Sequence, residues 1–457
     1  MEPRSLKYLA DACNGELLNG SPQRLATSIC TDSRKAGPGD LFFALSGERF
    51  DAHNFLSDVA KNGVIAVVAE RKKIPADFFT TVIAVDDTRR ALGNLAARYR
   101  EDFDLPIIAV GGSNGKTTTK ELLASVLRQK FSALWSEASF NNDIGVPITL
   151  LKLHSNHQVA VLEVGTNHPG ELAPLLHLIK PRLGVITSLG REHMEFFGDM
   201  EGVAKEEGSL ADVLPEQGTL FVNGDSEWIQ PIIQRSKAKV LRIGFSEKND
   251  CIASDVQFDE AGVTFSAKTV RDDLCGEYRI KLLGRHQVVN ALLAISVAGE
   301  LGLSRAEIQK GLLECEPALM RLQTWTINGI QILDDSYNAN ADSMLAALET
   351  LHDMPCNGRR VAVLGDMAEL GEYSIPAHTE VGRRAAELKI DQLFAVGANS
   401  RVTADSARRG GLKRVEEFSE IEMAGAALKK SLQSGDLVLL KASRSARIER
   451  IGEILKN

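Results

Sequence analysis

The sequence predicts an α/β protein built from three domains. Its 457 residues are enough for about three domains of ~100–200 residues each. Short apolar runs, typical of buried parallel strands, alternate along the chain with longer stretches of helical periodicity. No low-complexity tract or repeat of fixed period interrupts this alternation. We expect domains at residues 1–85, 86–316 and 317–457, with largely parallel sheets.

The apolar runs that predict strands are found in each of the three domains. In the first domain they are 41–45, 64–68 and 81–85; in the second, 107–110, 159–164, 183–187, 219–222 and 239–243; in the third, 360–364, 392–396 and 436–440. A helix is expected from about His286 to Leu301, and Ser304 with Glu307 forms a capping box that begins the next one. Pro317 ends that helix and marks the third domain.

Composition and charge exclude several classes of protein. The net charge of −8 argues against a nucleic-acid partner, which would require a basic face. The six cysteines are scattered without a C-x-x-C pair, so neither a zinc site nor a disulfide framework is expected. No stretch approaches ~18 uninterrupted apolar residues, so no membrane span is expected. We expect a cytoplasmic monomer.

A glycine-rich loop follows the predicted strand 107–110. The run 111–118 reads Gly-Gly-Ser-Asn-Gly-Lys-Thr-Thr and precedes a helical pattern. Its backbone amides can cradle a polyphosphate, Lys116 can reach the terminal phosphates, and Thr117 can bind magnesium. Val110 stands where the longer form of this motif has glycine, so the loop is a shorter variant. An ordinary glycine-rich turn is the alternative, but we favour nucleotide binding, with contacts from Gly112, Ser113, Asn114, Gly115, Lys116, Thr117 and Thr118.

Polar side chains also stand at the ends of two further predicted strands, which is the edge of a parallel sheet where ligands usually bind. Glu163 lies at the end of the predicted strand 159–164, and His193 follows the strand 183–187. Magnesium favours one or two carboxylates plus phosphate oxygens, which makes Glu163 a candidate ligand, with a solvated carboxylate as the alternative. His193 is equally compatible with a structural and a functional role. By composition alone, Lys205 would be a surface lysine.

In this order and context, the glycine-rich loop, Glu163, His193 and Lys205 resemble the Mur ligases. These are the ATP-dependent amino-acid or peptide ligases of peptidoglycan precursor synthesis. In that family the lysine matching Lys205 is carbamylated and helps to hold a second magnesium ion. The resemblance implies Lys116, His193 and Lys205 as catalytic residues, and Thr117, Glu163, His193 and Lys205 as metal ligands.

Further segments extend the resemblance to all three domains. Residues 139–147, 333–340 and 363–371 resemble the branch that adds D-alanyl-D-alanine to a UDP-muramyl tripeptide, and 31–34, 39–45 and 51–53 resemble its uridine-nucleotide-binding module. The fold implied is a small α/β uridine-nucleotide domain, a central P-loop ATPase domain and a C-terminal Rossmann-like domain for the dipeptide. The residues implied are Asn290, Arg321 and Asp335 for ATP, and Ser33, Arg34, Asn141, Asn142, Asn338 and Asn340 for the other substrates.

The resemblance has departures, and it leaves alternatives. Ala341 stands where the family usually has proline, and Ala442 where it usually has glycine. The Asp-Asn-Pro-Arg motif of the diaminopimelate-adding relative is absent. We expect an ATP-dependent amide ligase that works through an acyl phosphate. The alternatives are a Mur ligase that adds one amino acid, and a P-loop switch, which the lack of an N-K-x-D motif disfavours. The third residue of the accepted tripeptide, diaminopimelate or lysine, is not readable from the sequence.

Overall fold

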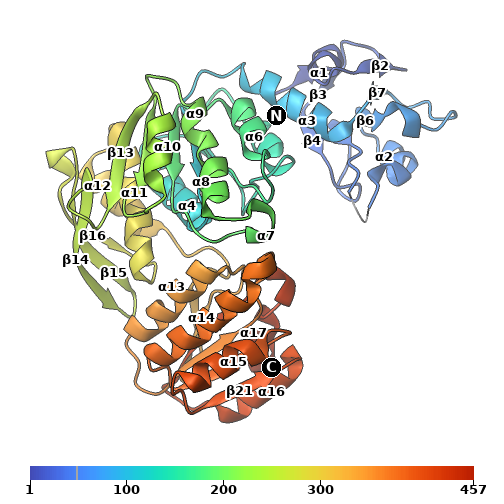
Figure 1. Ribbon diagram of the computed structural model, residues 1–457. Helices are drawn as coiled ribbons and strands as arrows, with labels where there is room; N and C mark the ends of the chain where they lie inside the picture. Colours follow the sequence, from blue (N-terminus) through green and yellow to red (C-terminus); the bar gives the residue numbers. More distant parts are fainter. Residues whose placement is uncertain (48–49, 457) are drawn as a thin grey trace. The chain divides into compact units, whose positions relative to one another are not determined.

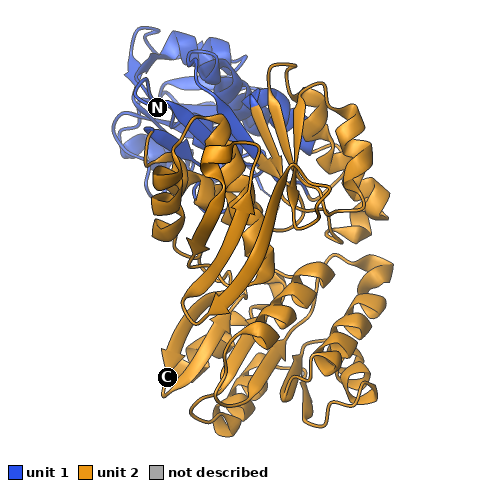
Figure 2. Cartoon of the chain, turned by 90° about the vertical axis from the view of Figure 1, so that its left-hand side faces the viewer, with its two compact units in different colours: residues 1–109, 131–166, 172–182 blue, residues 110–130, 167–171, 183–457 orange. Residues whose placement is uncertain are grey.

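The structure is a computed structural model that describes residues 1–47 and 50–456 (Figure 1). The chain divides into two compact units (Figure 2): residues 1–109, 131–166 and 172–182 form the first, and residues 110–130, 167–171 and 183–457 form the second. The phosphate loop therefore belongs to the same unit as the whole C-terminal region. The three domain boundaries read from the sequence stay predictions.

The N-terminal region contains a mainly parallel sheet. Its strands are β1 (Arg4–Ser5), β2 (Glu16–Leu18), β3 (Leu25–Ala26), β4 (Ser28–Cys30), β5 (Asp40–Phe43), β6 (Ala66–Glu70) and β7 (Val82–Val85). Its helices are α1 (Leu6–Ala12), η1 (Ala52–Phe55), α2 (Leu56–Lys61), η2 (Arg71–Lys73) and α3 (Thr88–Arg100). The sheet order is β2-β7-β6-β5-β4; β4 to β7 pair in parallel, and β2 pairs antiparallel with β7. Strands β1 and β3 form a separate antiparallel pair.

The central strands form a mixed sheet in the order β16-β15-β14-β13-β12-β11-β8-β10-β9. Their bounds are β8 (Ile107–Gly111), β9 (Ala133–Trp135), β10 (Val159–Glu163), β11 (Leu183–Ile186), β12 (Thr219–Asn223), β13 (Lys239–Gly244), β14 (Cys251–Asp259), β15 (Gly262–Lys268) and β16 (Gly276–Ile280). Pairing is parallel from β11 to β14 and antiparallel from β14 to β16. The antiparallel extension lies outside the strands expected from the sequence, because its apolar residues alternate with polar ones instead of forming runs.

Of the helices in the central region, the sequence predicted the one after the glycine-rich loop, the one from about His286 to Leu301 and the one that begins at Ser304. The helices of this region are α4 (Lys116–Leu127), α5 (Gly145–Leu150), α6 (Leu172–Ile179), α7 (Met194–Phe197), α8 (Met200–Glu207), α9 (Ser209–Val213), α10 (Ile229–Arg235), η3 (Asp272–Leu274), α11 (Arg285–Glu300) and α12 (Arg305–Glu314). The capping box at Ser304 is confirmed, with Glu307 as its partner. Helices α4, α11 and α12 pack against one another, and α11 is buried on nearly all sides.

The C-terminal region is a Rossmann-like layered domain. Its strands are β17 (Gln323–Ile327), β18 (Ile330–Asp334), β19 (Arg360–Leu364), β20 (Gln392–Val396), β21 (Val415–Phe418) and β22 (Leu437–Lys441). Its helices are α13 (Ala341–Asp353), η4 (Gly371–Tyr373), α14 (Ser374–Glu387), α15 (Ser400–Arg409), α16 (Ile421–Ser431), η5 (Arg444–Ala446) and α17 (Glu449–Lys456). The order is β17-β18-β22-β19-β20-β21, parallel except for β17. The expected three-domain α/β class with mostly parallel sheets is confirmed.

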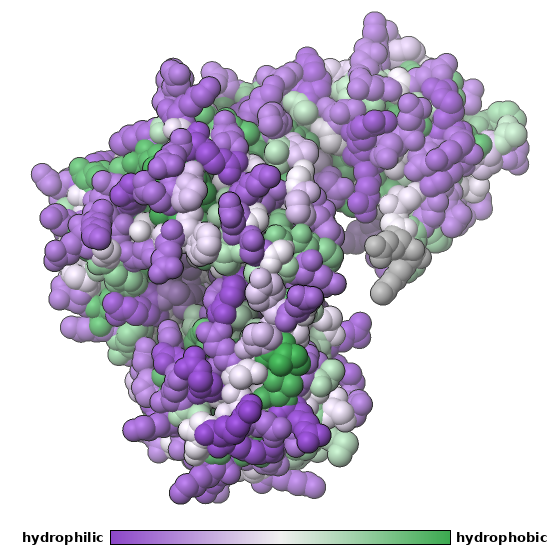
Figure 3. Space-filling view, in the orientation of Figure 1, coloured by the Kyte–Doolittle hydropathy of each residue, from purple (hydrophilic) through white to green (hydrophobic). Residues whose placement is uncertain are grey.

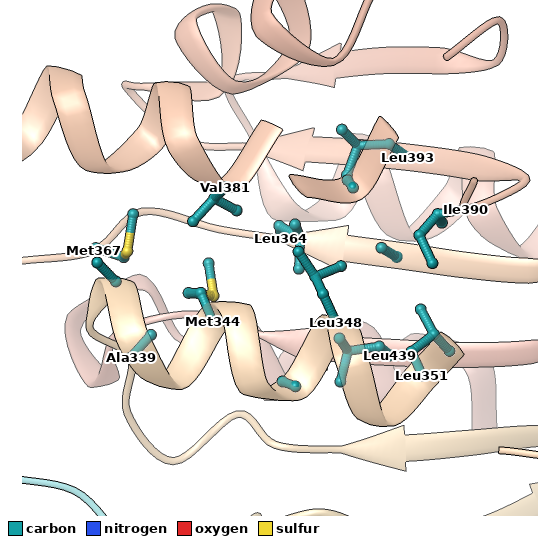
Figure 4. Close-up of a cluster of buried hydrophobic side chains, with 14 of the residues drawn as sticks. Ala339, Met344, Leu348, Leu351, Leu364, Met367, Val381, Ile390, Leu393 and Leu439 are labelled. Carbon is teal, nitrogen blue, oxygen red and sulfur yellow. The ribbon is translucent and has the colours of Figure 1, made fainter. Parts of the chain in front are cut away.

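Side-chain alternation places two apolar clusters on opposite faces of the C-terminal sheet. Ala362 and Leu364 of β19 pack with α13 and α14, whereas Val361 and Val363 pack with α16 and α17. Figure 4 shows the first cluster, in which Leu348 of α13 lies among side chains from strands and helices.

The face drawn in Figure 3 is mostly hydrophilic, with apolar residues in small scattered patches. Among the residues that the structure describes, no helix combines the length and the apolar character needed to cross a membrane.

We expect Leu348→Ala to lower the free energy of unfolding by about 2–5 kcal/mol, because it empties a buried site that the surroundings fill only in part. The measurement is urea unfolding followed by circular dichroism. Met423→Ala, at a side chain that is 63% exposed, is the control and is expected to change stability by less than about 0.5 kcal/mol. Equal midpoints for the two variants would contradict the packing described.

Candidate active site

The loop between β8 and α4 has the backbone conformation expected of a phosphate-binding turn. Gly112 has φ +110°, and Gly115, which precedes helix α4, has φ +87°. A Cβ atom on Gly112 would lie 2.6 Å from Thr187 Oγ1, and one on Gly115 would lie 2.7 Å from Asn290 Oδ1. Glycine is therefore required at both positions. The predicted ATP contact Asn290 packs directly against the loop.

The segment after β11 fixes this loop through hydrogen bonds. The Ser113 amide donates to the Ser188 carbonyl (2.7 Å), and the Asn114 amide donates to Ser188 Oγ (3.0 Å). Ser113 Oγ accepts from the Gly190 amide (2.9 Å), and Thr187 Oγ1 donates to the Asn114 carbonyl (2.6 Å). These bonds engage the backbone amides of Ser113 and Asn114 as well as the Ser113 side chain and the Asn114 carbonyl.

Lys116 is directed back over the loop that precedes it. Its Nζ donates to the carbonyl of Gly112 and to that of Ser113 (3.3 Å). It also forms an ion pair with Glu192, with 3.4 Å between Nζ and Oε2. The side chain is only 14% exposed, so its charge acts in a poorly hydrated place.

Glu207, the last residue of α8, is a site residue that reasoning from the sequence missed. The Gly112 amide donates to its Oε2 (2.6 Å), and the residue is 1% exposed. Burial raises the pKa of the Glu207 carboxyl to about 7, while the Lys116 ammonium opposes the rise and the Glu192 carboxylate adds to it. The sequence did carry a signal for Glu207. It follows the apolar Val203 by one helical turn, so the two side chains lie on the same face of the helix, and that face is buried.

Thr117 and Glu163 each present a buried oxygen without a hydrogen-bond partner. Thr117 Oγ1 is one, at the start of α4 in the second unit. In the first unit, Glu163 Oε2 is another, while Glu163 Oε1 accepts from Asn141 Nδ2 (2.9 Å). Hydroxyl and carboxylate oxygens are ligands that magnesium prefers, so these donors fit the ion. No group of three or more His, Cys, Asp or Glu side chains within residues 1–47 and 50–456 is arranged to hold a metal.

The other two predicted metal ligands, His193 and Lys205, have different environments. His193 precedes α7 with φ +47°, a strained conformation for a residue other than glycine, and its Nδ1 lies 2.5 Å from Glu369 Oε2 of the C-terminal region. This contact lowers the pKa of the Glu369 carboxyl. Lys205 is exposed on α8, and its carbonyl accepts from Arg235 (2.8 Å).

Arg191 ties the phosphate-loop segment to the C-terminal region. Its guanidinium donates from Nε (3.0 Å) and Nη2 (2.6 Å) to Asp342 Oδ1, while its backbone amide donates to Asp342 Oδ2 (2.6 Å). Its Nη1 donates to Glu380 (2.6 Å). Beside it, Asn340 Nδ2 donates to Asn114 Oδ1 of the phosphate loop (3.0 Å), and Asn340 Oδ1 caps α13.

Asp335 and Asn338 lie in the loop after β18, around the buried Lys441. The Lys441 ammonium, 2% exposed, donates to Asp335 Oδ2 (2.5 Å) and to the Asn338 carbonyl (3.1 Å). Arg321 stacks on the ring of Tyr337, with its guanidinium carbon 4.3 Å from the ring centre. The ion pair with Lys441 and the stacking of Arg321 on Tyr337 therefore hold this loop in place. No pattern in the sequence indicated that Lys441 binds Asp335.

The remaining predicted substrate contacts belong to the first unit. Arg34 is exposed and donates from Nε and Nη2 to Asp32 (both 2.9 Å), next to Ser33. These hydrogen bonds lower the pKa of the Asp32 carboxyl to about 2. Asn142 Oδ1 accepts from the Gly145 amide (2.9 Å) at the start of α5. Their assignment to substrates stays a prediction.

Comparison with known proteins identifies the family. The chain is 35% identical over 455 residues to the UDP-N-acetylmuramoyl-tripeptide–D-alanyl-D-alanine ligase of Bacillus subtilis strain 168, covering 99% of this chain and 98% of that one. It belongs to the Mur ligase family. Residues 26–100 match the Mur ligase family catalytic domain, 110–298 the Mur ligase middle domain, and 320–444 the Mur ligase glutamate ligase domain.

Solved structures of Mur ligases share the whole architecture. The structure of MurF from Acinetobacter baumannii matches with a TM-score of 0.91 and 33% identity over 100% of both chains. A MurF ligase from Thermotoga maritima, solved in complex with ADP, matches with a TM-score of 0.82 and 27% identity over 94% of this chain and 97% of that one. This chain is an ATP-dependent Mur ligase, as the sequence predicted.

We expect Gly115→Ala to weaken the binding of ADP by at least about tenfold. The left-handed conformation costs an L-residue roughly 1–2 kcal/mol, and about 1.4 kcal/mol corresponds to a factor of ten; the contact with Asn290 adds to this cost. Isothermal titration calorimetry with ADP measures the effect. Gly93→Ala, whose Cβ would meet Leu178 at an ordinary 3.6 Å, is the control. Unchanged affinity in Gly115→Ala would contradict the role of the loop.

Proposed function

We propose that this chain joins the free carboxylate of a UDP-N-acetylmuramoyl-tripeptide to the amine of D-alanyl-D-alanine, using ATP, in peptidoglycan precursor synthesis. The observation that carries the proposal is similarity over the full length, at 35% identity, to ligases of that name. Residues of the phosphate loop, such as Asn114, also contact the C-terminal region that the resemblance assigns to the dipeptide. A cytoplasmic location remains part of the proposal, since ATP and UDP-linked substrates are cytoplasmic, and a monomer stays a prediction.

The reaction proceeds in two group transfers. The tripeptide carboxylate oxygen attacks the γ-phosphorus of ATP, the bond to the β-γ bridging oxygen breaks, and ADP leaves. The dipeptide amine then attacks the acyl carbon, inorganic phosphate departs with the electron pair of the carbon–oxygen bond, and the amine loses a proton. Both anionic reactants must approach each other, so positive charge from Lys116 and the amides of the loop lowers the barrier.

Magnesium accompanies the nucleotide in this proposal. Thr117 and His193, both in the second unit, would hold it, and the ion would supply further charge neutralisation at the transferred phosphoryl group. The unpartnered oxygen of Thr117 supports this assignment. Glu163 stays a candidate ligand from the sequence. Carbamylation of Lys205 is implied by the resemblance alone, and the side chain of this lysine is exposed on α8.

The substrates of the proposed reaction are assigned by region. Ser33 and Arg34 would contact the uridine nucleotide, and the exposed guanidinium of Arg34 suits an anionic group. Asn290, Arg321 and Asp335 would contact ATP. The remaining predicted substrate contacts are Asn141, Asn142, Asn338 and Asn340.

The test is phosphate release from purified protein supplied with ATP, UDP-muramyl tripeptide and D-alanyl-D-alanine. We expect release only when all three are present, because the acyl phosphate turns over only when the amine attacks it. Panels of tripeptides ending in diaminopimelate or lysine, and of single amino acids in place of the dipeptide, define the acceptor. Equal release without the dipeptide, or with a single amino acid in its place, would overturn the proposal.

We expect Lys116→Ala to lower kcat by at least about 10²-fold, the usual cost of removing one preorganised charge or donor at a transferred group. The same phosphate assay, at saturating substrates, measures the effect. Lys152→Ala, at a half-buried lysine outside the loop that pairs with Glu137, is the control and should keep the parent rate. A Lys116→Ala enzyme with parent kcat would contradict the assignment.

A further inference from the structure

Helix α8 directs a carboxylate, and not an amine, to the phosphate loop. Val203, Ala204 and Glu207 are buried on one side of the helix, whereas Lys205 is exposed on another. Residues two apart on a helix point in directions about 200° apart, so Lys205 and Glu207 cannot both face the loop without unwinding α8.

Glu207 has one satisfied and one unsatisfied carboxylate oxygen. Its Oε2 accepts from the Gly112 amide, as described above, while its Oε1 is buried without a hydrogen-bond partner. Leaving a buried carboxylate oxygen unpaired is costly unless a proton or a cation neutralises the group. The loop supplies a second such atom, because Thr117 Oγ1 is also buried and without a partner.

The charges of the loop require a further cation once a nucleotide is bound. The described side chains there include two carboxylates, Glu192 and Glu207, and the ammonium of Lys116. A triphosphate adds about four negative charges near neutral pH, which one ammonium cannot balance at low effective dielectric. A divalent ion that binds both the phosphates and Glu207 would remove the excess.

We propose that Glu207 is a ligand of the magnesium ion that accompanies ATP, so that α8 contributes to the metal site through an unmodified glutamate and needs no carbamate on Lys205. The proposal deepens the function given above and rests on its nucleotide site, but not on the identity of the peptide substrates. Glutamate oxygen is a hard ligand of the kind magnesium prefers. The exposed amine of Lys205, by contrast, lies on the side of α8 away from the loop.

The deciding experiment measures binding of a non-hydrolysable ATP analogue, AMP-PNP, by calorimetry, with magnesium and with EDTA, and without either peptide substrate. Failure of the proposed ligase reaction would leave these measurements unaffected. In Glu207→Gln we expect the affinity gained from magnesium to fall by on the order of tenfold. Without metal, the variant should bind AMP-PNP at least as tightly as the parent, because a negative charge beside the triphosphate is gone.

Glu201→Gln, at an exposed carboxylate in the first turn of the same helix, is the matched control and should behave as the parent does in both buffers. Glu207→Asp keeps the charge on a shorter side chain and should retain part of the magnesium effect. An equal loss of affinity with and without magnesium in Glu207→Gln would indicate a purely structural role and overturn the proposal.

A second measurement on the parent protein does not depend on how the variants fold. Carbon-13 NMR of the protein in ¹³C-labelled bicarbonate with magnesium and AMP-PNP reports a lysine carbamate directly. We expect no carbamate resonance, and the same AMP-PNP affinity in bicarbonate-free and bicarbonate-saturated buffer. A carbamate signal, or an affinity that rises with bicarbonate, would assign the ligand to a modified lysine instead and contradict the role of Glu207.

Discussion

The segment Ser188–His193 is bonded on one side to the phosphate loop and on the other to the C-terminal region, and the rest of the site depends on this double attachment. Ser188 and Gly190 hold the backbone and side chain of Ser113, while Arg191 binds Asp342 with its guanidinium and its own amide. A short segment bonded at both ends has few conformations available to it. The conformation of the phosphate loop and the position of α13 are therefore set by the same residues.

Local charge, and not the charge of the whole chain, makes this loop suitable for an anion. The chain carries a net −8, and carboxylates lie beside the loop itself, so the general field does not attract a triphosphate. Attraction has to come from the N-terminus of α4 and from Lys116. Glu192 and Glu207 add negative charge beside the loop, so nucleotide binding there depends on a cation. We therefore expect the site to bind a metal–nucleotide complex more tightly than the free nucleotide.

Local patterns predicted the glycine loop and most of the longer parallel strands, because both are marked by contiguous residues, but missed the parallel strands β4, β9, β18 and β21. Strands β19 and β20 coincide residue for residue with their apolar runs, and the Ser304 capping box begins α12 as expected. Strands β14–β16 gave no such run, since their side chains alternate between core and solvent. Their antiparallel pairing joins strands that follow one another along the chain, so the alternating pattern, which is the local signal of a half-buried strand, was present but formed no apolar run.

At the site, the type and spacing of residues in the sequence identified candidates, but they did not determine the direction in which each side chain points. Lys205 and Glu207 differ by two positions, and only the helical phase set by Val203 separates the exposed side chain from the buried one. No sequence pattern singled out Lys441, because its pairing with Asp335 depends on β18 and β22 being neighbours in the sheet. Such contacts arise from tertiary packing, which no short motif encodes.

The bond between Asn340 and Asn114 has a thermodynamic consequence. Asn340 caps α13, so the positive end of that helix dipole lies at the phosphate loop whenever the bond is formed. If nucleotide binding favours this arrangement, the arrangement must favour nucleotide binding by the same factor, because linked equilibria are reciprocal. By the same linkage, a molecule that separated Arg191 from Asp342 would weaken nucleotide binding without occupying the phosphate loop.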